Sequence, residues 1–147
     1  MNDKGQSADL IMKLYDLRRE EKMREARNWF ASFFPESADE IMKTIINPET
    51  SAYYRMVTSY WDMAASFVNQ GAIDEEMYMA SGGEGMVVFA KIEPFIAEIR
   101  EVTNRPKMYS NLESLVMRQP NAKETLESQR EMMKKFIQAR AELAKGA

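Results

Sequence analysis

Polar residues form a stripe between Tyr53 and Gln70, in a segment where most other residues are apolar. The stripe consists of Arg55, Thr58 (or its neighbour Ser59), Asp62, Ser66 and Asn69, which recur at spacings of three and four and so share one face of an α-helix. An Asp62 carboxylate cannot extend past neighbouring helices to water, so it needs hydrogen-bond donors or a cation such as Arg55 or Arg100. The stripe is therefore either a buried network that fixes helix packing or the lining of a pocket that orients a polar group of a ligand.

The chain lacks the residues that most often carry catalysis and metal binding. Its 147 residues include no Cys and no His, which excludes thiol nucleophiles, cysteine-based zinc sites, Ser-His-Asp triads and histidine-based metal sites. The glycine-rich run 81–85 lacks the Lys-Ser/Thr pair of a phosphate-binding loop, and Glu84 within it would repel a phosphate. We therefore expect no enzymatic activity, no metal and no cofactor.

Aromatic residues cluster near the end of the first predicted helix. Trp29, Phe30, Phe33 and Phe34 cover more of the helix circumference than one buried stripe needs. Because large aromatic side chains carry much of the contact energy at protein interfaces, Trp29, Phe30 and Phe34 are candidate anchors of a homodimer. The alternative places all of them in the core of a single chain. The 13 methionines, which pack adaptably, suit either interpretation.

Charge and hydropathy exclude two classes of partner. The chain has 20 Lys and Arg against 23 Asp and Glu, a net charge of −3, and its bases are not gathered on the positive face that nucleic-acid binding requires. The longest run without a charged residue, Met63–Ile73, is too short to span a membrane. The polar residues 1–9 do not have the pattern of a signal peptide. We therefore expect a soluble, cytoplasmic protein with no nucleic-acid partner and no membrane span.

Helical periodicity dominates the sequence, and strand-like alternation is absent. The pattern predicts one all-α domain over residues 1–147, a bundle of six or seven helices with residues 1–6 and 145–147 frayed. The central helix is expected from about Pro48 to Gln70; because it is apolar nearly all round, other helices must cover it. The remaining helices are expected over about 7–34, 37–46, 74–80, 84–103 with a kink before Pro94, 104–118 and 121–145.

The block Ser59–Glu101 has a recognisable order of features. An aromatic helix ends in Gly-Ala-Ile-Asp-Glu-Glu, a short helix and a glycine break follow, and the next helix closes with Glu-Pro-Phe-Ile and an Arg. This block resembles a bacterial family of small all-helical domains of unknown function, some of whose members carry an N-terminal membrane helix. The resemblance implies a helical fold and supplies neither an activity nor catalytic residues.

Three function classes are compatible with these residues. The first is a non-enzymatic interaction or scaffold protein that acts through helix–helix contacts, as a homo-oligomer or with another protein. The second is a helical bundle that binds a small apolar or amphipathic molecule. The third, an enzyme that uses only carboxylates and tyrosines, is disfavoured because no group of residues converges on a reaction class.

Overall fold

The computed structural model describes residues 3–146, and residues 1, 2 and 147 lie outside the described part. The described residues form α-helices, one short 3-10 helix and their connections, without a strand, which confirms the predicted all-α class. Of the ends predicted to fray, residues 4–6 and 145 are helical, and residues 1, 2 and 147 are among those not described. Along the chain the elements are α1 (Lys4–Arg18), α2 (Glu21–Ser32), α3 (Ala38–Ile46), α4 (Ser51–Asn69), α5 (Glu75–Ala80), α6 (Glu84–Ile92), η1 (Glu93–Phe95), α7 (Ile96–Thr103), α8 (Ser110–Met117) and α9 (Ala122–Lys145).

The single helix predicted over 7–34 is two helices, α1 and α2, which meet at Arg19 and Glu20. The Glu20 carboxylate accepts hydrogen bonds from the backbone N–H groups of Lys22 and Met23, at 3.1 and 2.9 Å, and so caps α2. These backbone hydrogen bonds hold the pKa of Glu20 below its usual value. Glu20, in the charged segment between α1 and α2, is thus the capping residue of α2.

Two of the later helix boundaries follow from backbone geometry. The kink predicted before Pro94 is present, because α6 ends at Ile92 and the 3-10 helix η1 leads into α7. The helix predicted over 104–118 begins only at Ser110. Asn104 and Tyr109 adopt left-handed conformations, with φ of 56° and 61°, which a continuous helix cannot contain. Residues 104–109 are therefore a loop.

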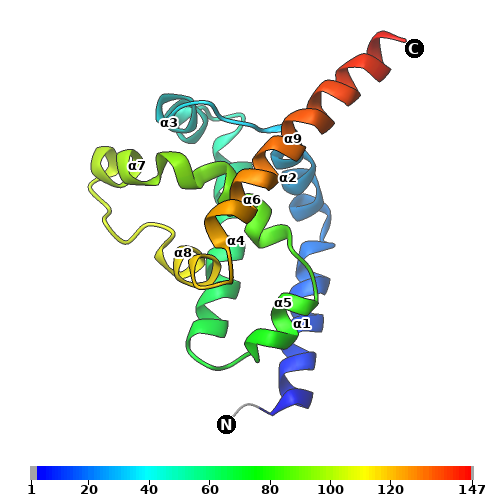
Figure 1. Cartoon of the computed structure of the whole chain (residues 1–147), viewed down its shortest axis with the longest axis vertical. Helices are drawn as coiled ribbons and strands as arrows, with labels where there is room; N and C mark the ends of the chain where they lie inside the picture. The colour runs from blue at the N-terminus through cyan, green and yellow to red at the C-terminus, as the bar shows by residue number, and fades with distance from the viewer. Residues whose placement is uncertain (1–2, 147) are drawn as a thin grey trace.

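Helix α4 lies at the centre of the fold, as predicted, and packs against α2, α3, α6 and α8 (Figure 1). Its buried residues are Tyr54, Val57, Thr58, Tyr60, Trp61, Ala64, Ala65 and Val68. Trp61 is 6% exposed and meets α6 at Gly85, where an added Cβ would lie 3.1 Å from the indole Cε3. The other helices cover α4 less completely than expected, because Met63 and Phe67 of this helix are 39% and 40% exposed.

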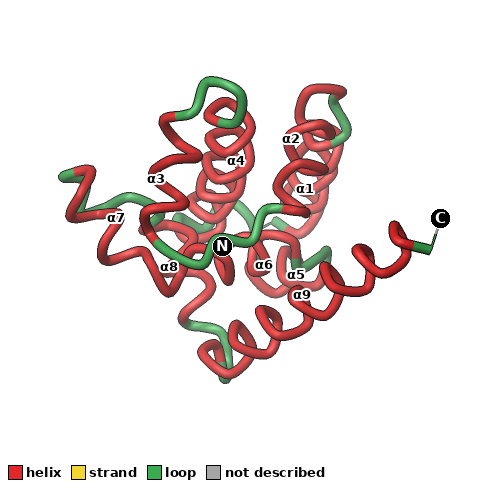
Figure 2. Tube along the Cα trace, turned by 90° about the horizontal axis from the view of Figure 1, so that it is seen from above, coloured by secondary structure: helices red, strands yellow, loops and turns green. Residues whose placement is uncertain are grey.

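Helix α9 packs on α6 and then leaves the rest of the molecule. Its C-terminal end projects away from the other helices in both views (Figures 1 and 2). Only Ala122 and Leu126, near its beginning, are buried. Within residues 3–146, no helix combines the length and the apolar character that a membrane crossing requires.

Candidate functional site

A cleft opens along one side of α4, between α3 and the loop that joins α7 to α8. Its volume is about 690 Å³. Three of the five residues of the predicted polar stripe, Arg55, Thr58 and Asp62, lie in its wall. The full lining consists of Ile45, Tyr54, Arg55, Thr58, Ser59, Asp62, Thr103, Arg105, Met108 and Tyr109.

The Asp62 carboxylate at this cleft is bound by hydrogen-bond donors of α8. It accepts hydrogen bonds from the backbone N–H of Leu112 at 2.9 Å and from Asn111 Nδ2 at 3.1 Å. These donors belong to the first turn of α8, where the helix dipole favours a negative charge. Of the two partners expected for Asp62, amide donors rather than an arginine are therefore found.

The arginines considered as partners of Asp62 lie elsewhere. Arg100 donates to Glu113 at 2.9 Å and to the carbonyl oxygen of Met108 at 2.9 Å, so it ties α7 to the following loop and to α8. Arg55 is exposed, and its guanidinium makes no ion pair or side-chain hydrogen bond with residues 3–146. The alternative in which an arginine pairs with Asp62 is thus not found in the described part of the chain.

The other two residues of the stripe lie outside the cleft. The Ser66 hydroxyl donates to the carbonyl oxygen of Met63 in its own helix, at 2.6 Å. Asn69 donates to the carbonyl oxygen of Asn111 at 3.0 Å and accepts from Arg118 at 2.7 Å. Arg55, Thr58 and Asp62 of the stripe therefore line the cleft. Asp62 also bonds to α8, as does Asn69, whereas Ser66 bonds within α4.

Two tyrosines that the sequence did not single out form part of the cleft wall. The hydroxyls of Tyr54 and Tyr109 lie 2.7 Å apart, and the Thr58 hydroxyl donates to the carbonyl oxygen of Tyr54 at 2.9 Å. Burial raises the pKa of both tyrosines, which therefore stay neutral at physiological pH. Tyr54 looked like an ordinary core residue in the sequence, and no local signal links it to a residue 55 positions away.

The positive charge at the cleft comes from Arg55 on α4 and Arg105 in the loop. Both are exposed, and the Arg105 guanidinium likewise makes no ion pair or side-chain hydrogen bond within residues 3–146. Asp62 is hydrogen-bonded to neutral amide groups of α8, and the remaining lining is neutral, so the formal net charge of the lining is +1. The arrangement suits a ligand with an anionic group near the two arginines and an apolar part against Ile45, Met108 and the tyrosine rings.

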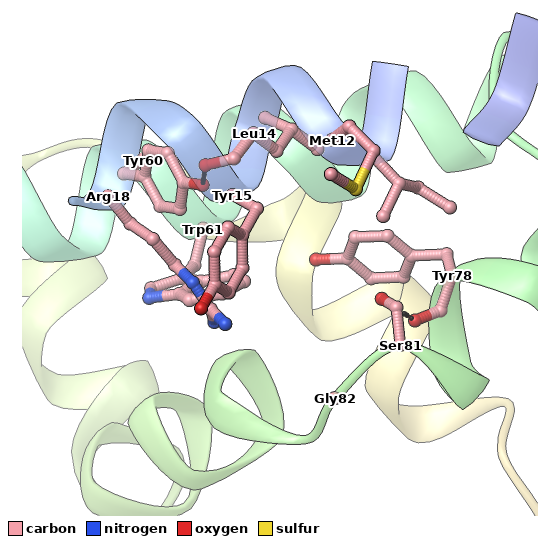
Figure 3. A pocket seen from close by; sticks show the side chains of 10 residues that line it. Met12, Leu14, Tyr15, Arg18, Tyr60, Trp61, Tyr78, Ser81 and Gly82 are labelled. Atoms are coloured by element: carbon pink, nitrogen blue, oxygen red, sulfur yellow. Dashed lines mark hydrogen bonds between the residues drawn. The ribbon is translucent and has the colours of Figure 1, made fainter. Parts of the chain in front are cut away.

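A second, smaller hollow lies between α1, α4 and α5, with a volume of about 170 Å³ (Figure 3). Arg18 lies over the Tyr15 ring at 4.6 Å, and the Tyr60 hydroxyl donates to the carbonyl oxygen of Leu14. Burial raises the pKa of Tyr60 to about 12. The Tyr78 hydroxyl points into the hollow (Figure 3). Its small volume makes this hollow a weaker candidate than the cleft.

The aromatic residues proposed as interface anchors are only partly accessible. Phe30 is 2% exposed and lies in the core, with its ring centroid 6.2 Å from that of Tyr54, so a second chain cannot reach it. Trp29 is half-buried and stacks on Phe33 at 5.0 Å. Phe34 is also half-buried, beneath the Lys134 ammonium at 5.7 Å. Within the chain this cluster therefore serves mainly to pack α2.

No cluster suited to a metal ion occurs in the described part of the chain, since no three His, Cys, Asp or Glu side chains converge there. The cleft itself contributes one carboxylate, that of Asp62. Its chemistry is that of hydrogen bonding, charge and apolar contact.

Comparison with known proteins yields one family. A family model described as a domain of unknown function (DUF4760) matches residues 5–119. The match reaches well beyond the block Ser59–Glu101 that first suggested such a family, and it includes every residue of the cleft while leaving out α9. No curated protein and no solved structure matches the chain significantly.

Proposed function

Since the chain belongs to this family of domains of unknown function, we propose a function from its own geometry: it is a non-catalytic helical protein that binds a small amphipathic anion in the cleft beside α4. One observation carries the proposal. Two arginines from different elements, Arg55 and Arg105, flank a cleft of about 690 Å³, and neither is neutralised by a carboxylate within residues 3–146.

The charge of the ligand follows from these arginines. A guanidinium presents several N–H donors in a planar fork, which binds carboxylate, sulfonate or phosphate oxygens in pairs. Asp62 reduces this preference without cancelling it, because two arginines and one carboxylate leave the lining with a formal net charge of +1. An anionic group near Arg55 and Arg105 therefore has donors available on both sides of the cleft.

The apolar character of the ligand follows from the rest of the wall. Ile45 and Met108 offer aliphatic surface, and the rings of Tyr54 and Tyr109 lie beside them. Pockets for small molecules combine such apolar lining with a few polar groups that fix orientation. The Thr58 and Ser59 hydroxyls donate to backbone carbonyl oxygens of α4, so they can offer a ligand only their acceptor oxygens.

A matched pair of fluorescent probes tests the proposal. Anilinonaphthalene sulfonate carries an anionic group, and N-phenylnaphthylamine has the same aromatic frame without it. We expect the sulfonate probe to bind in a saturable one-to-one complex and more tightly than the neutral probe. Arg55→Gln and Arg105→Gln should each weaken binding of the sulfonate probe by up to about fivefold, the range of an exposed charge pair. Neither substitution should change the affinity for the neutral probe.

The control is Arg19→Gln, which removes an exposed arginine directly after α1 and outside the cleft. Circular dichroism and melting curves verify that every variant folds, so that dye binding to unfolded chains is excluded. Equal binding of the two probes, or equal effects of the cleft variants and the control, would contradict an anion site at the cleft.

A further inference from the structure

The C-terminal part of α9 has no helix packed on it within the described chain. Every residue from Gln138 to Gly146 is exposed, and the helix projects away from the body (Figures 1 and 2). Helical segments this short are marginal in water when nothing packs on them. A surface that covers this end would therefore stabilise it.

One face of this projecting end is apolar. Met132, Phe136, Ala139 and Leu143 follow one another at spacings of four, three and four, which aligns them along one face of the helix. The side chains of Met132, Phe136 and Leu143 are 48%, 60% and 76% exposed. Such a stripe is typical of a helix that pairs with another helix.

On one side of this stripe the charges are complementary to those of a second, antiparallel copy. Lys135 and Glu142 flank the stripe on the same side, seven residues apart. If two such helices cross about a two-fold axis at Ala139, each Lys135 lies opposite the Glu142 of the other copy. Within residues 3–146 the Glu142 carboxylate forms one ion pair, with Lys145 at 3.8 Å, and this pair is about three-quarters exposed and contributes little.

We propose that two copies of this chain associate through antiparallel pairing of the C-terminal halves of α9. Phe136 of each copy packs near Leu143 of the other, and the small side chain of Ala139 lets the two backbones approach at the axis. This surface is distinct from the half-buried Trp29 and Phe34, and it is separate from the ligand cleft. It also lies outside residues 5–119, the part that the family model matches.

Sedimentation equilibrium of the full chain over a concentration series tests the proposal. We expect a reversible monomer–dimer equilibrium for the unchanged protein and a monomer for Leu143→Glu. The matched control is Val102→Glu, which places the same charge at a 65% exposed apolar position on α7 and should leave the dimer intact. Both positions are exposed, so circular dichroism should report folded chains.

Charge reversal tests the antiparallel register. Lys135→Glu or Glu142→Lys turns both intermolecular attractions into repulsions, and each should raise the dissociation constant by about tenfold. An equimolar mixture of these two variants should recover dimers, because the two acidic side chains of the first variant then face the two basic side chains of the second. No parallel arrangement about the same stripe brings these two positions together.

Three results would overturn the proposal. The first is an unchanged protein that stays monomeric at millimolar concentration. The second is a dimer that survives Leu143→Glu or is lost equally in Val102→Glu, which would place the interface elsewhere. The third is a mixture of the two charge-reversal variants that associates no better than either variant alone, which would exclude the antiparallel pairing.

Discussion

Asp62 on α4 and Leu112 on α8 are joined by a hydrogen bond of 2.9 Å from the Leu112 backbone N–H to the Asp62 carboxylate. Helix α8 has no cap of its own, because Tyr109 precedes it in a left-handed conformation and offers no side-chain hydrogen bond. A residue from a distant helix therefore caps α8. The cap also fixes one wall of the cleft, since Tyr109 and Asp62 both line it.

Replacing Asp62 with Asn tests this cap. The substitution keeps the shape of the side chain but removes the charge at the amino-terminal end of α8. We expect the free energy of unfolding to fall by about 1–2 kcal/mol, as for the loss of a helix cap with its dipole interaction. Urea denaturation measures the change.

The control for this experiment is Ser66→Ala, since among residues 3–146 the Ser66 hydroxyl bonds only within its own helix. This variant should stay within about 0.5 kcal/mol of the unchanged protein. A loss of about 3 kcal/mol or more, which is what an uncompensated buried cation costs, would instead indicate an arginine partner for Asp62. Unchanged stability would show that the carboxylate does not cap α8.

Lys91 gives the protein a pH-dependent stability. Its side chain is buried, and its ammonium donates to the carbonyl oxygen of Phe30 at 2.6 Å and lies 5.0 Å from the Phe30 ring centre. Burial, with a smaller contribution from the charge of Arg140, lowers the pKa of Lys91 from 10.5 to about 8. Between these values the unfolded chain holds a proton that the folded chain has lost, so stability rises with pH.

Urea denaturation from about pH 7 to about pH 9.5 measures this effect, which cannot exceed about 1.4 kcal/mol per pH unit for one proton. In Lys91→Met the rise should disappear. The exposed Lys43 pairs with Asp39 at 3.0 Å, and Lys43→Met should keep the rise. A Lys91→Met variant with the same pH dependence as the unchanged protein would refute the assignment to Lys91.

The sequence predicted the helices whose boundaries are set by neighbouring residues. The Ser37 hydroxyl caps α3 by accepting from Glu40 N at 3.2 Å, and the Asp74 carboxylate caps α5 by accepting from Met77 N at 3.0 Å, so both helices begin near the predicted positions. Gly71, with φ of 84°, lies in the left-handed region just after α4, which ends close to the predicted Gln70. In each case the interacting groups lie within a few residues of one another.

The cleft could be predicted only in part, because contacts between distant segments create it. The spacing of Arg55, Thr58 and Asp62 placed them on one face, and the structure confirms that they line one cleft. Tyr109 and Arg105 were assigned to a helix that does not begin until after them. Their loop is held by tertiary hydrogen bonds, such as that from Arg100 to the Met108 carbonyl oxygen at 2.9 Å, which no local pattern reveals.

Trp61 should be the most sensitive position in the core. It is 6% exposed and fills the space between α4 and Gly85 of α6. Trp61→Ala should lower the free energy of unfolding by about 3–5 kcal/mol, because it leaves a cavity. Trp61→Phe should cost less, since the indole N–H that it removes has no hydrogen-bond partner within residues 3–146. Equal losses in the two variants would contradict this account.

The ion pair between Arg27 and Glu84 joins α2 to the start of α6. Two parallel hydrogen bonds, of 2.8 and 2.7 Å, connect the groups, and the hydrogen bond to Glu84 raises the pKa of Arg27. The two side chains are 27% and 31% exposed, so water screens their attraction. We therefore expect Glu84→Gln to lower the free energy of unfolding by only about 1 kcal/mol. Thermal melting of the two variants measures these costs. Asp39→Asn, which breaks a largely solvated pair within α3, should cost less than Glu84→Gln.

Nuclear magnetic resonance titration with anilinonaphthalene sulfonate tests the central claim, anion binding at the cleft, most directly. We predict saturable shifts of the Arg55 and Arg105 side-chain N–H signals and of the backbone amides of residues 104–109, with one shared dissociation constant. Shifts confined to the hollow around Tyr78, or spread over the surface without saturation, would contradict the claim.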